Sequence, residues 1–287
     1  MPSTTTVRIA VPNKGALASA AAEMMREAGY RQRGDGARDL VLRDPDNNVE
    51  FFYLRPRDIA VYVGAGTVDV GVTGRDLLLD SGAAAQELLA LGFGGSTFRF
   101  AARPGTADDV TDFAGLRVAT SYPGLLRDYF AERGIDASVI RLDGAVETAV
   151  QLGVADVIAD VVETGTTLRQ AGLEVVGEPI LRSEAVLVAR RDGERPAAVQ
   201  QLVRRLNGVL VARSYVMMDY DIRAEHLDEA SALTPGLESP TVSPLHREGW
   251  VAVRSMVPRV DAQRVMDDLW EIGARAILVT DILACRI

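Results

Sequence analysis

The stretch Asp160-Val-Val-Glu-Thr-Gly-Thr-Thr-Leu168 joins two segments of different character and so indicates how this part of the chain folds. Residues 154–159 form a β-branched apolar run typical of a strand, and residues 168–173 are able to open a helix. This order predicts a strand that delivers four residues to the first turn of a helix: Thr164, Gly165, Thr166 and Thr167. Free backbone N–H groups and the positive end of the helix dipole favour an anion there.

The residue types of this loop suit a phosphate that is attached to a sugar. Gly165 lets the backbone approach a ligand closely, and the threonine hydroxyls supply further hydrogen-bond donors. Asp160 cannot bind a phosphate, but its carboxylate can accept hydrogen bonds from sugar hydroxyls. The alternative interpretation is an ordinary helix with a threonine N-cap.

The composition of the chain limits the class of ligand. Of 287 residues, 48% are apolar and 25% are charged, as in ordinary globular proteins. The net charge of −9 argues against general binding to nucleic acid or to an anionic membrane. Because the overall field repels anions, an anionic substrate must be bound by a local cationic pocket.

The termini and the single cysteine bear on the compartment. Cys285 is the only cysteine, so an internal disulfide is impossible and a cysteine-based metal site is not expected. Residues 1–6 lack the basic and apolar regions of a signal peptide, and no apolar run approaches the ~20 residues needed to span a bilayer. We therefore expect a cytoplasmic protein without a membrane partner.

Strands and helices are predicted to alternate along the first two thirds of the chain. This alternation favours an α/β fold with a mainly parallel sheet covered by helices. A glycine-rich segment, residues 92–96, marks a hinge-like change between two α/β lobes, and loops at the carboxyl ends of the strands should line the cleft between them. The first lobe is predicted to contain residues 1–95 and 183–213, and the second residues 96–182. Strands are expected at 7–11, 50–54, 68–73, 117–120, 138–141 and 184–189, with helices at 16–28 and 58–63.

The last third has a different pattern. A long helix at 196–213 is followed by segments that read strand, helix, strand, strand, helix, strand. This βαββαβ order is that of a ferredoxin-like α+β unit, here residues 214–287. The expected segments are 216–221, 225–233, 241–245, 250–254, 261–272 and 276–279.

A resemblance to a known family now rests on several motifs. The spaced residues Glu147, Gly153, Ala155, Ile158, Asp160, Thr164, Gly165, Thr167 and Leu168 resemble the signature of ATP phosphoribosyltransferase, the first enzyme of histidine biosynthesis. The likeness extends over essentially the whole chain, with further matching segments at 12–17, 54–58, 73–76 and 237–241. The C-terminal unit is similar to that of the long form. The resemblance implies a two-lobed, periplasmic-binding-protein-like core, a histidine-binding regulatory domain, and a homohexamer built from dimers.

The implied reaction is transfer of a phosphoribosyl group. N1 of ATP attacks C1 of the ribose in phosphoribosyl pyrophosphate, which leaves phosphoribosyl-ATP and pyrophosphate. Such a step needs positioning and anion stabilisation more than a strong base. Both histidines, His226 and His246, fall in the C-terminal unit, where a solvated or structural role is expected. Mg²⁺ is implied as cofactor, carried mainly by phosphates, and its protein ligands stay unassigned.

The resemblance also implies roles for particular residues. Lys14 and Asp160 are the catalytic candidates, and Lys14 has a solvated loop lysine as its alternative. Many family members have an arginine where this chain has Ala16, so part of the pyrophosphate site is missing or supplied elsewhere. The phosphoribosyl pyrophosphate site is expected to contain Asp160, Glu163, Thr164, Gly165, Thr166 and Thr167. The nucleotide site is expected to contain Arg55, Asp76, Leu77 and Tyr122, with Arg57 as an alternative to Arg55 and ordinary packing as the alternative for Tyr122.

An effector site is expected in the C-terminal unit. Histidine presents an ammonium, a carboxylate and an imidazole, so a small site must offer a carboxylate together with hydroxyl or backbone donors. The predicted residues are Asp221, Ser239, Thr241 and Ala276. The alternative is a surface turn with an N-cap serine. Histidine and AMP are the inhibitors that the resemblance implies, and a nucleic-acid partner is not expected.

Other classes of function fit a two-lobed α/β protein. Solute-binding proteins and the effector domains of regulators share this architecture, although neither a signal peptide nor a helix-turn-helix segment is evident. A non-catalytic regulatory paralogue is a third possibility, against which the intact 160–168 loop argues. Release of pyrophosphate from phosphoribosyl pyrophosphate and ATP distinguishes an enzyme from a binding module.

Overall fold

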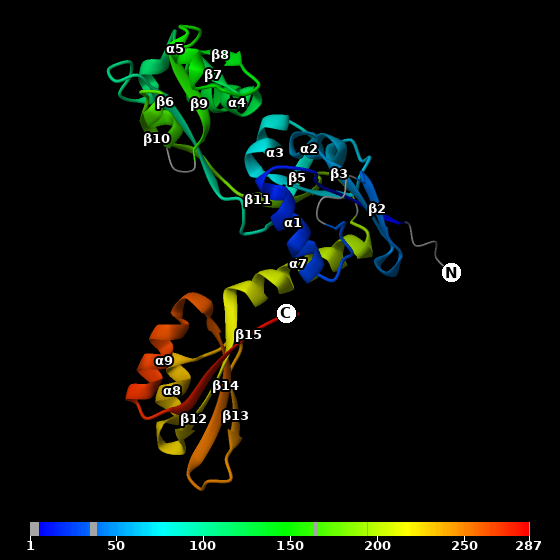
Figure 1. The fold of residues 1–287 in the computed structure, drawn as a ribbon, viewed down its shortest axis with the longest axis vertical. Helices are drawn as coiled ribbons and strands as arrows, with labels where there is room; N and C mark the ends of the chain where they lie inside the picture. The colour runs from blue at the N-terminus through cyan, green and yellow to red at the C-terminus, as the bar shows by residue number, and fades with distance from the viewer. Residues whose placement is uncertain (1–5, 35–38, 163–165, 194, 287) are drawn as a thin grey trace. The chain divides into compact units, whose positions relative to one another are not determined.

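The computed structural model describes residues 6–34, 39–162, 166–193 and 195–286 (Figure 1). Contacts between residues divide the chain into two compact units. The first contains the chain up to Gln200 except Glu27–Gly29, and the second contains Gln201 onward with Glu27–Gly29. No helix in the described ranges has both the length and the apolar character that a membrane span requires.

The first lobe is built on a six-stranded sheet, here called sheet A, in the order β2-β3-β1-β4-β11-β5. The central pairs, β1 with β3 and β1 with β4, are parallel, whereas β2, β11 and β5 are joined by antiparallel pairing. Sheet A is therefore mixed and not mainly parallel in its pairing, because β2 and β11 run opposite to β3, β1, β4 and β5. The strands are β1 Val7–Pro12, β2 Val41–Asp44, β3 Val49–Leu54, β4 Val70–Gly74, β5 Ala85–Ala90 and β11 Ala185–Arg190.

Between residues 6 and 95, the described chain forms the α-helices α1 Ala16–Glu27, α2 Pro56–Gly64 and α3 Arg75–Ser81. Helix α2 begins with a proline, whose missing N–H and fixed φ suit the first helical position. Its apolar residues Ile59 and Val63 are fully buried against the sheet, in one cluster with Ala10 and Val186. Helix α2 packs very closely on β4 at Gly71, where an added Cβ would collide with the side chain of Ile59.

The second lobe has a five-stranded sheet, sheet B, in the order β10-β6-β9-β7-β8. Pairs β7 with β8 and β7 with β9 are parallel, and the other two are antiparallel. Its core is aromatic: Phe100 stacks on Phe130 at 5.7 Å and meets Phe113 edge to face at 4.8 Å. The elements are β6 Ser96–Ala102, β7 Arg117–Thr120, β8 Ser138–Arg141, β9 Val157–Val162, β10 Glu174–Ser183, α4 Pro123–Arg133, α5 Thr148–Gln151 and α6 Thr166–Gln170.

The chain crosses between sheets A and B twice, and Glu184 and Ala185 of the second crossing hydrogen-bond to Gly92 and Phe93 of the first. One carboxylate oxygen accepts from the Gly92 amide at 3.0 Å, and the other pairs with Arg75 at 3.2 Å. The backbone of Ala185 completes the contact by donating to the Phe93 carbonyl at 2.9 Å. The two crossing segments therefore lie side by side and are both bonded to the half-buried Glu184.

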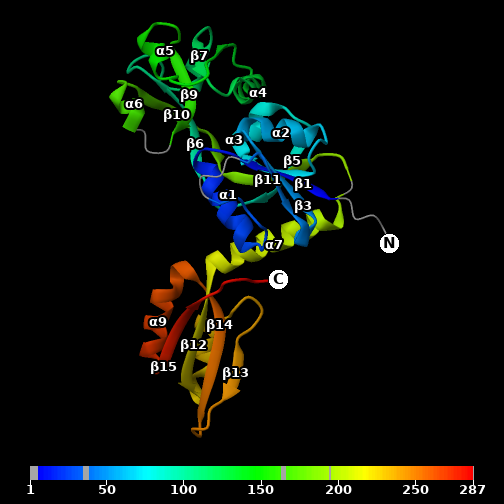
Figure 2. The ribbon, with the colours of Figure 1, turned by 45° about the vertical axis from the view of Figure 1, so that its right-hand side comes forward.

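The C-terminal unit forms the third sheet, sheet C, of order β13-β14-β12-β15 with antiparallel pairing throughout. Helices α8 and α9 cover one face, where Tyr220, Val253 and Leu269 are buried (Figures 1 and 2). The predicted ferredoxin-like unit is confirmed. Its elements, after α7 Ala197–Ser214, are β12 Tyr215–Arg223, α8 Leu227–Leu233, β13 Thr241–Pro244, β14 Trp250–Pro258, α9 Ala262–Glu271 and β15 Arg275–Asp281.

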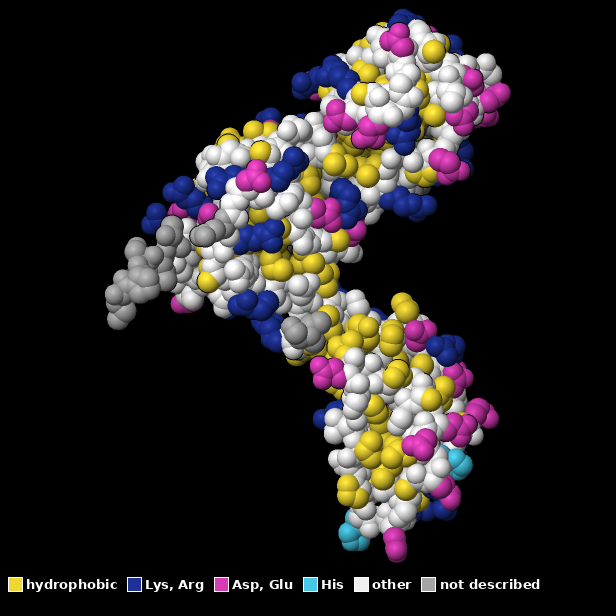
Figure 3. Space-filling model, turned by 180° about the vertical axis from the view of Figure 1, so that it is seen from behind, with side chains coloured by type: hydrophobic (Ala, Val, Ile, Leu, Met, Phe, Trp, Pro, Cys, Tyr) yellow, Lys and Arg dark blue, Asp and Glu magenta, His cyan; other side chains and the backbone are white. Residues whose placement is uncertain are grey.

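The other face of sheet C is open within this unit. Met217, Asp219 and Asp221 of β12 alternate with buried neighbours and point to this face, as does Leu278 of β15, which is 61% exposed. Figure 3 shows hydrophobic side chains gathered along this unit beside acidic ones. At Ala276 the backbone has φ +52 and the pairing of β15 with β12 shifts register, as in a β-bulge. The lobe and domain boundaries given above remain predictions.

Candidate active site

The two lobes of the first unit meet where α3 faces the start of α4. Asp80 of α3 pairs with Arg57 at 2.6 Å through one oxygen. Its other oxygen accepts from the backbone N–H groups of Gly124 and Leu125 at 2.8 and 3.3 Å. These are free amides of the first turn of α4, so a carboxylate from one lobe caps a helix of the other. A side chain at position 124 would collide with the Asp80 carbonyl, so only glycine permits this approach.

Tyr122 lies at the centre of this junction, one residue before α4. Burial is the largest cause of a pKa of Tyr122 well above its usual value, and the nearby Asp76 carboxylate raises it further. The ring packs edge to face on Phe98 at 5.2 Å, and the guanidinium of Arg57 lies 4.9 Å from the ring centroid. An aromatic face is therefore presented beside a buried carboxylate and a cation.

Asp76 is buried, with 6% of its surface exposed, in the first turn of α3. Its backbone N–H donates to the hydroxyl of Ser183 at 3.0 Å, and this hydroxyl donates to the Asp76 carboxylate at 2.9 Å. Ser183 is the last residue of β10 and was missed from the sequence, because no motif surrounds it and it lies 107 positions from Asp76. Leu77, the next residue in the predicted nucleotide site, is half-buried.

Of the two arginines around Pro56, the structure brings Arg57 to this junction. Arg55 is the N-cap residue of α2 and is exposed, and its side chain makes no cap hydrogen bond. The assignment of Arg55 to the nucleotide site stays a prediction, and the alternative Arg57 contacts both Asp80 and Tyr122. The cause is helical geometry, which turns the first residues of α2 in different directions.

Asp160 lies inside β9, because the strand runs to Val162, three residues beyond its predicted end. Its carboxylate is half-buried and accepts from the Val161 N–H at 2.8 Å. Burial is the largest cause of a raised pKa for Asp160; repulsion by Glu147 raises it further, and Arg57 opposes the shift. Asp160 therefore lies within electrostatic reach of the same arginine that contacts Tyr122.

The predicted anion loop is described only in part. Glu163, Thr164 and Gly165 lie outside the described residues, so their predicted contacts stay predictions. Thr166 and Thr167, the last two residues of the predicted loop, begin α6, so they lie in the first turn of a helix as expected. Leu168 is buried with Val150 and Leu173 and holds this short helix on sheet B.

Lys14 follows β1 in the loop before α1 and is exposed. In the described chain it forms no ion pair. Gly15 has φ +80, a conformation that glycine adopts without strain, and it lets the chain turn sharply from strand to helix. The loop lies beside the end of β3, since the Asn13 N–H donates to the Leu54 carbonyl at 2.8 Å.

The predicted effector residues lie on or beside the open face of sheet C, but they do not line a single cavity. Ser239 and Thr241 border a cavity of about 600 Å³ that also contains Met217 and Arg254, whereas Asp221 and Ala276 are not part of its lining. Thr241 pairs with Arg254 of β14, which pairs in turn with Asp219 of β12. One strand therefore lies between Thr241 and β12, a separation of about 10 Å, and Asp221 is two residues further along β12. The predicted strand 216–221 ends at Asp221. In the structure β12 continues to Arg223, so Asp221 lies inside the strand.

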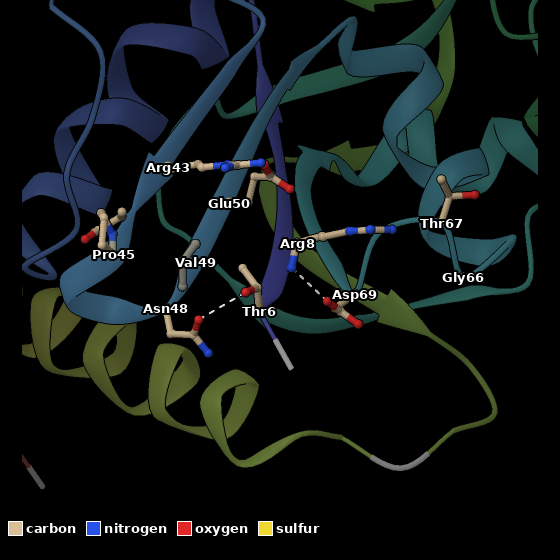
Figure 4. A pocket seen from close by; sticks show the side chains of 11 residues that line it. Thr6, Arg8, Arg43, Pro45, Asn48, Val49, Glu50, Gly66, Thr67 and Asp69 are labelled. Atoms are coloured by element: carbon tan, nitrogen blue, oxygen red, sulfur yellow. Dashed lines mark hydrogen bonds and ion pairs between the residues drawn. The ribbon is translucent and has the colours of Figure 1, made fainter. Parts of the chain in front are cut away.

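A larger cavity of about 700 Å³ lies elsewhere on the first lobe (Figure 4). It is bordered by Thr6, Arg8 and Asp69, at the amino ends of the parallel strands, so it is separate from the predicted active-site loops, which follow the carboxyl ends. In the described ranges, no three histidine, cysteine or acidic residues converge as a metal site.

Comparison with known proteins adds independent observations. A profile of the family described as ATP phosphoribosyltransferase matches residues 55–208, and one described as the HisG C-terminal domain matches residues 212–284. The ATP phosphoribosyltransferases of Streptomyces avermitilis and Arthrobacter sp. are 66% and 65% identical to this chain, each over 98% of it and 100% of the relative. Among solved structures, the ATP phosphoribosyl transferase (HisG:HisZ) complex from Thermotoga maritima aligns at 23% identity and TM-score 0.57, over 70% of this chain and 98% of that one. The two-lobed fold predicted for the core is confirmed.

Proposed function

The chain belongs to the ATP phosphoribosyltransferase family, and we propose that it binds both substrates of this family around the junction of α3 and α4. The enzyme transfers the phosphoribosyl group of phosphoribosyl pyrophosphate to N1 of ATP, the first step of histidine biosynthesis. The observation that carries the placement is the cluster of Arg57, Asp76 and Tyr122, contributed by both lobes. The placement of each substrate follows from the chemistry of these side chains.

The nucleotide is placed against Tyr122. Adenine stacks on an aromatic face, and the buried Asp76 carboxylate accepts hydrogen bonds from the exocyclic amine. Ser183 and the Asp76 backbone fix this carboxylate in one orientation. Arg57 brings a cation to the same place and suits the nucleotide phosphates. This arrangement holds N1 of adenine in position, which is the main contribution a transferase of this kind can make.

The ribose is placed between Asp160 and Lys14. Asp160 accepts from the ribose hydroxyls and, as a carboxylate, favours positive charge that develops on the ring in the transition state. Residues 164–167 hold the 5′-phosphate at the start of α6, and Lys14 meets the pyrophosphate. The N1 lone pair forms the bond to C1 while the C1–O pair leaves with pyrophosphate, so no proton has to move in this step.

Mg²⁺ is part of the proposal, since pyrophosphate binds it strongly. The carboxylates of Asp160 and Glu147 repel each other, and hard oxygen donors of this kind suit the ion, which usually takes one or two carboxylates besides phosphate and water. Bound there, the cation neutralises charge on pyrophosphate. We also propose a cytoplasmic location and a homohexamer built from dimers, which sedimentation of the 30.8 kDa chain tests.

The activity is tested by incubating the protein with phosphoribosyl pyrophosphate, ATP and Mg²⁺ and measuring pyrophosphate release. The expected result is turnover that requires all three. Binding of either substrate without turnover contradicts the proposal and favours a binding module. AMP is expected to inhibit by competing with ATP, because it carries the same adenosine.

Tyr122→Ala is expected to weaken AMP binding about 5- to 150-fold, since stacking of a base on an aromatic ring is worth ~1–3 kcal/mol. Tyr122→Phe keeps the ring and removes only the hydroxyl beside Asp76, so its effect is smaller. Calorimetric titration with AMP and with phosphoribosyl pyrophosphate measures both. Tyr62→Ala, which removes an exposed ring from α2, is the control. Equal losses for the two ligands would mean that the adenosine site lies elsewhere.

Histidine is proposed to bind beside Asp221 on the open face of sheet C. Asp221 forms no ion pair in the described chain, although Asp219, two residues earlier, pairs with Arg254 at 2.6 Å. In the strand register Asp221 lies opposite the small Ala252 of β14 on one side and Arg275 of β15 on the other. The guanidinium of Arg275 lies 4.1 Å from the ring centroid of Trp270. Ala276 adds no bulk at the bulge. An unpaired carboxylate among small residues suits the ammonium group of an amino acid.

Asp221→Ala is expected to raise the histidine concentration for half inhibition at least tenfold, because it removes the partner of the ammonium group. Turnover without histidine should stay near the wild-type value, since no predicted substrate-binding residue lies beyond position 190. Asp219→Ala is the matched control, as it removes a carboxylate from the same face. Unchanged inhibition of Asp221→Ala rejects this effector site but leaves the enzyme activity untouched.

A further inference from the structure

The guanidinium of Arg33 is fixed at the edge of sheet A where β1 and β3 end. It lies 4.0 Å from the ring centroid of the buried Tyr53. Its Nη2 donates to the Asn13 carbonyl and its Nη1 to the Asp39 carbonyl, each at 3.0 Å. The backbone N–H of Arg33 donates to the Tyr53 hydroxyl at 3.2 Å. The side chain is therefore held by an aromatic ring and two carbonyls, which leave its charge uncompensated.

Three cations gather at this edge without carboxylate partners. Neither Arg33 nor Lys14 nor Arg55 forms an ion pair with any carboxylate in the described ranges. The register of β1 and β3 brings them together: Pro12 pairs with Leu54, so the loop that contains Lys14 runs beside Arg55. The Arg33 side chain hydrogen-bonds to the carbonyl of Asn13, the residue before Lys14. In a chain of net charge −9, such a group is unusual and indicates an anionic ligand.

Two further features of this edge point to the same ligand. Helix α1 starts at Ala16 and runs for 12 residues, so its free N–H groups and positive dipole end lie at the loop. The side-chain oxygen of Asn13 is buried without a hydrogen-bond partner in the described chain. A buried acceptor of this kind is usually completed by a ligand or an ordered water. The cations suit phosphate groups of a ligand, and the Asn13 oxygen can accept a hydrogen bond from a hydroxyl group of the same ligand.

We propose that Arg33 is a further substrate-binding residue, which binds the pyrophosphate of phosphoribosyl pyrophosphate together with Lys14 and stabilises it as it leaves. The inference rests on the ribose site proposed above. A guanidinium has five N–H donors, of which the two carbonyls use two, so three remain for phosphate oxygens. Breaking of the C1–O bond places its electron pair on pyrophosphate, and a fixed cation favours that state over the bound substrate.

Two variants separate charge from structure. Arg33→Met keeps packing on Tyr53 and removes the charge, while Arg33→Lys keeps the charge but loses the forked contact with the two carbonyls. Arg8→Ala is the matched control, because it removes one positive charge from β1 at the opposite edge of the same sheet (Figure 4). For each protein we would measure product inhibition by pyrophosphate, KM and kcat for phosphoribosyl pyrophosphate, and AMP binding.

Arg33→Met is expected to weaken inhibition by pyrophosphate about 10- to 150-fold, the range for a hydrogen bond to a charged group. It should lower kcat/KM for phosphoribosyl pyrophosphate by a similar factor and leave AMP binding unchanged. Arg33→Lys should recover part of the loss, and Arg8→Ala should match the wild type.

Three results would overturn the inference. The first is pyrophosphate inhibition of Arg33→Met at the wild-type level. The second is an equal loss of pyrophosphate binding in Arg33→Met and Arg33→Lys, and the third is an equal loss of AMP and pyrophosphate binding in Arg33→Met; either of these two indicates a purely structural role. Lys14→Ala distinguishes a wrong assignment of Arg33 from a wrong placement of the whole ribose and pyrophosphate site. If Lys14→Ala weakens pyrophosphate binding and Arg33→Met does not, only Arg33 is misassigned. If both leave it unchanged, the proposed ribose site is wrong.

Discussion

Asp160→Asn is expected to lose nearly all turnover and yet to be at least as stable as the wild type at neutral pH. Asparagine keeps the shape and can accept the same hydrogen bond from the Val161 N–H. It removes the negative charge that we place beside the ribose, where positive charge develops in the transition state, an effect of about 10²- to 10³-fold for one electrostatic group. Steady-state turnover and thermal unfolding of the two proteins measure this.

The stability of these proteins should depend on pH in a defined direction. Burial, with repulsion by Glu147, raises the pKa of Asp160 in the folded protein above its unfolded value. The protonated form is therefore the one that folding favours, and this stabilisation is complete below the unfolded pKa. It is lost as the pH rises through the raised folded pKa. The asparagine variant has no such dependence, so its advantage over the wild type should grow across that window.

Asp156→Asn provides the control. Asp156 directly precedes β9, and its contact with Arg117 lowers the pKa of its carboxyl group. Its small contribution is present above the unfolded pKa and is lost as the pH falls through the lowered folded pKa, the reverse of Asp160. Turnover of this variant should be normal. Substantial turnover in folded Asp160→Asn contradicts the catalytic role, and a large loss of stability at neutral pH contradicts the electrostatic argument.

Gly71→Val is expected to prevent the first lobe from folding. Gly71 is buried in β4, and an added Cβ would collide with the side chain of Ile59 and press on Val63 and Ala10 at 3.2 and 3.3 Å. All three neighbours are fully buried, so none can move aside cheaply. Overpacking costs ~1–3 kcal/mol or more, and three adverse contacts exceed the ~1 kcal/mol that a β-branched residue gains in a strand. Gly71→Ala should be destabilised by about 1–3 kcal/mol.

The measurement has to distinguish the units. Both tryptophans, Trp250 and Trp270, lie in the C-terminal unit, so their fluorescence reports that unit alone. Far-UV circular dichroism in urea should show a lower midpoint for Gly71→Ala, whereas the tryptophan transition stays in place. Gly95→Ala is the control, because an added Cβ there meets no atom within 4 Å and φ is ordinary. A wild-type midpoint for Gly71→Val would contradict the packing argument.

The sequence allowed prediction of elements whose pattern is local. Strand β1 is an apolar run interrupted only by Arg8, α2 begins at a proline, and α9 has a clear apolar face, so all three lie where expected. Strand β10 has little regular alternation of buried and exposed residues, and its register shifts between Val176 and Leu181, so no period marks it. Strand β5 likewise has no clear period and acquires its place only by pairing with β11.

The candidate site shows the same division. Tyr122 and Asp76 were predicted from motifs, and the structure brings them together. Ser183 and Arg33, which we propose as further site residues, were not predicted, because their contacts with Asp76 and Asn13 join segments distant in the chain and no local pattern indicates them. The choice between Arg55 and Arg57 depended on which side of α2 each occupies, and the Arg-Pro-Arg sequence does not specify that. A sequence motif gives the type of a side chain, whereas its orientation depends on contacts with residues distant in the chain.

The position of β11 between β4 and β5 has a consequence for biogenesis. Strand β5 has β11 as its single neighbour in sheet A, and β11 follows only after the whole second lobe. During translation, roughly 100 residues separate the two strands, which at ~5–20 residues per second corresponds to about 5–20 s. Throughout that interval β5 has no strand partner on either side, and sheet A stays incomplete while the aromatic core of the second lobe can already form. The nascent chain should therefore be most open to aggregation or chaperone binding at Ala85–Ala90, and a pause just before residue 185 would lengthen that exposure.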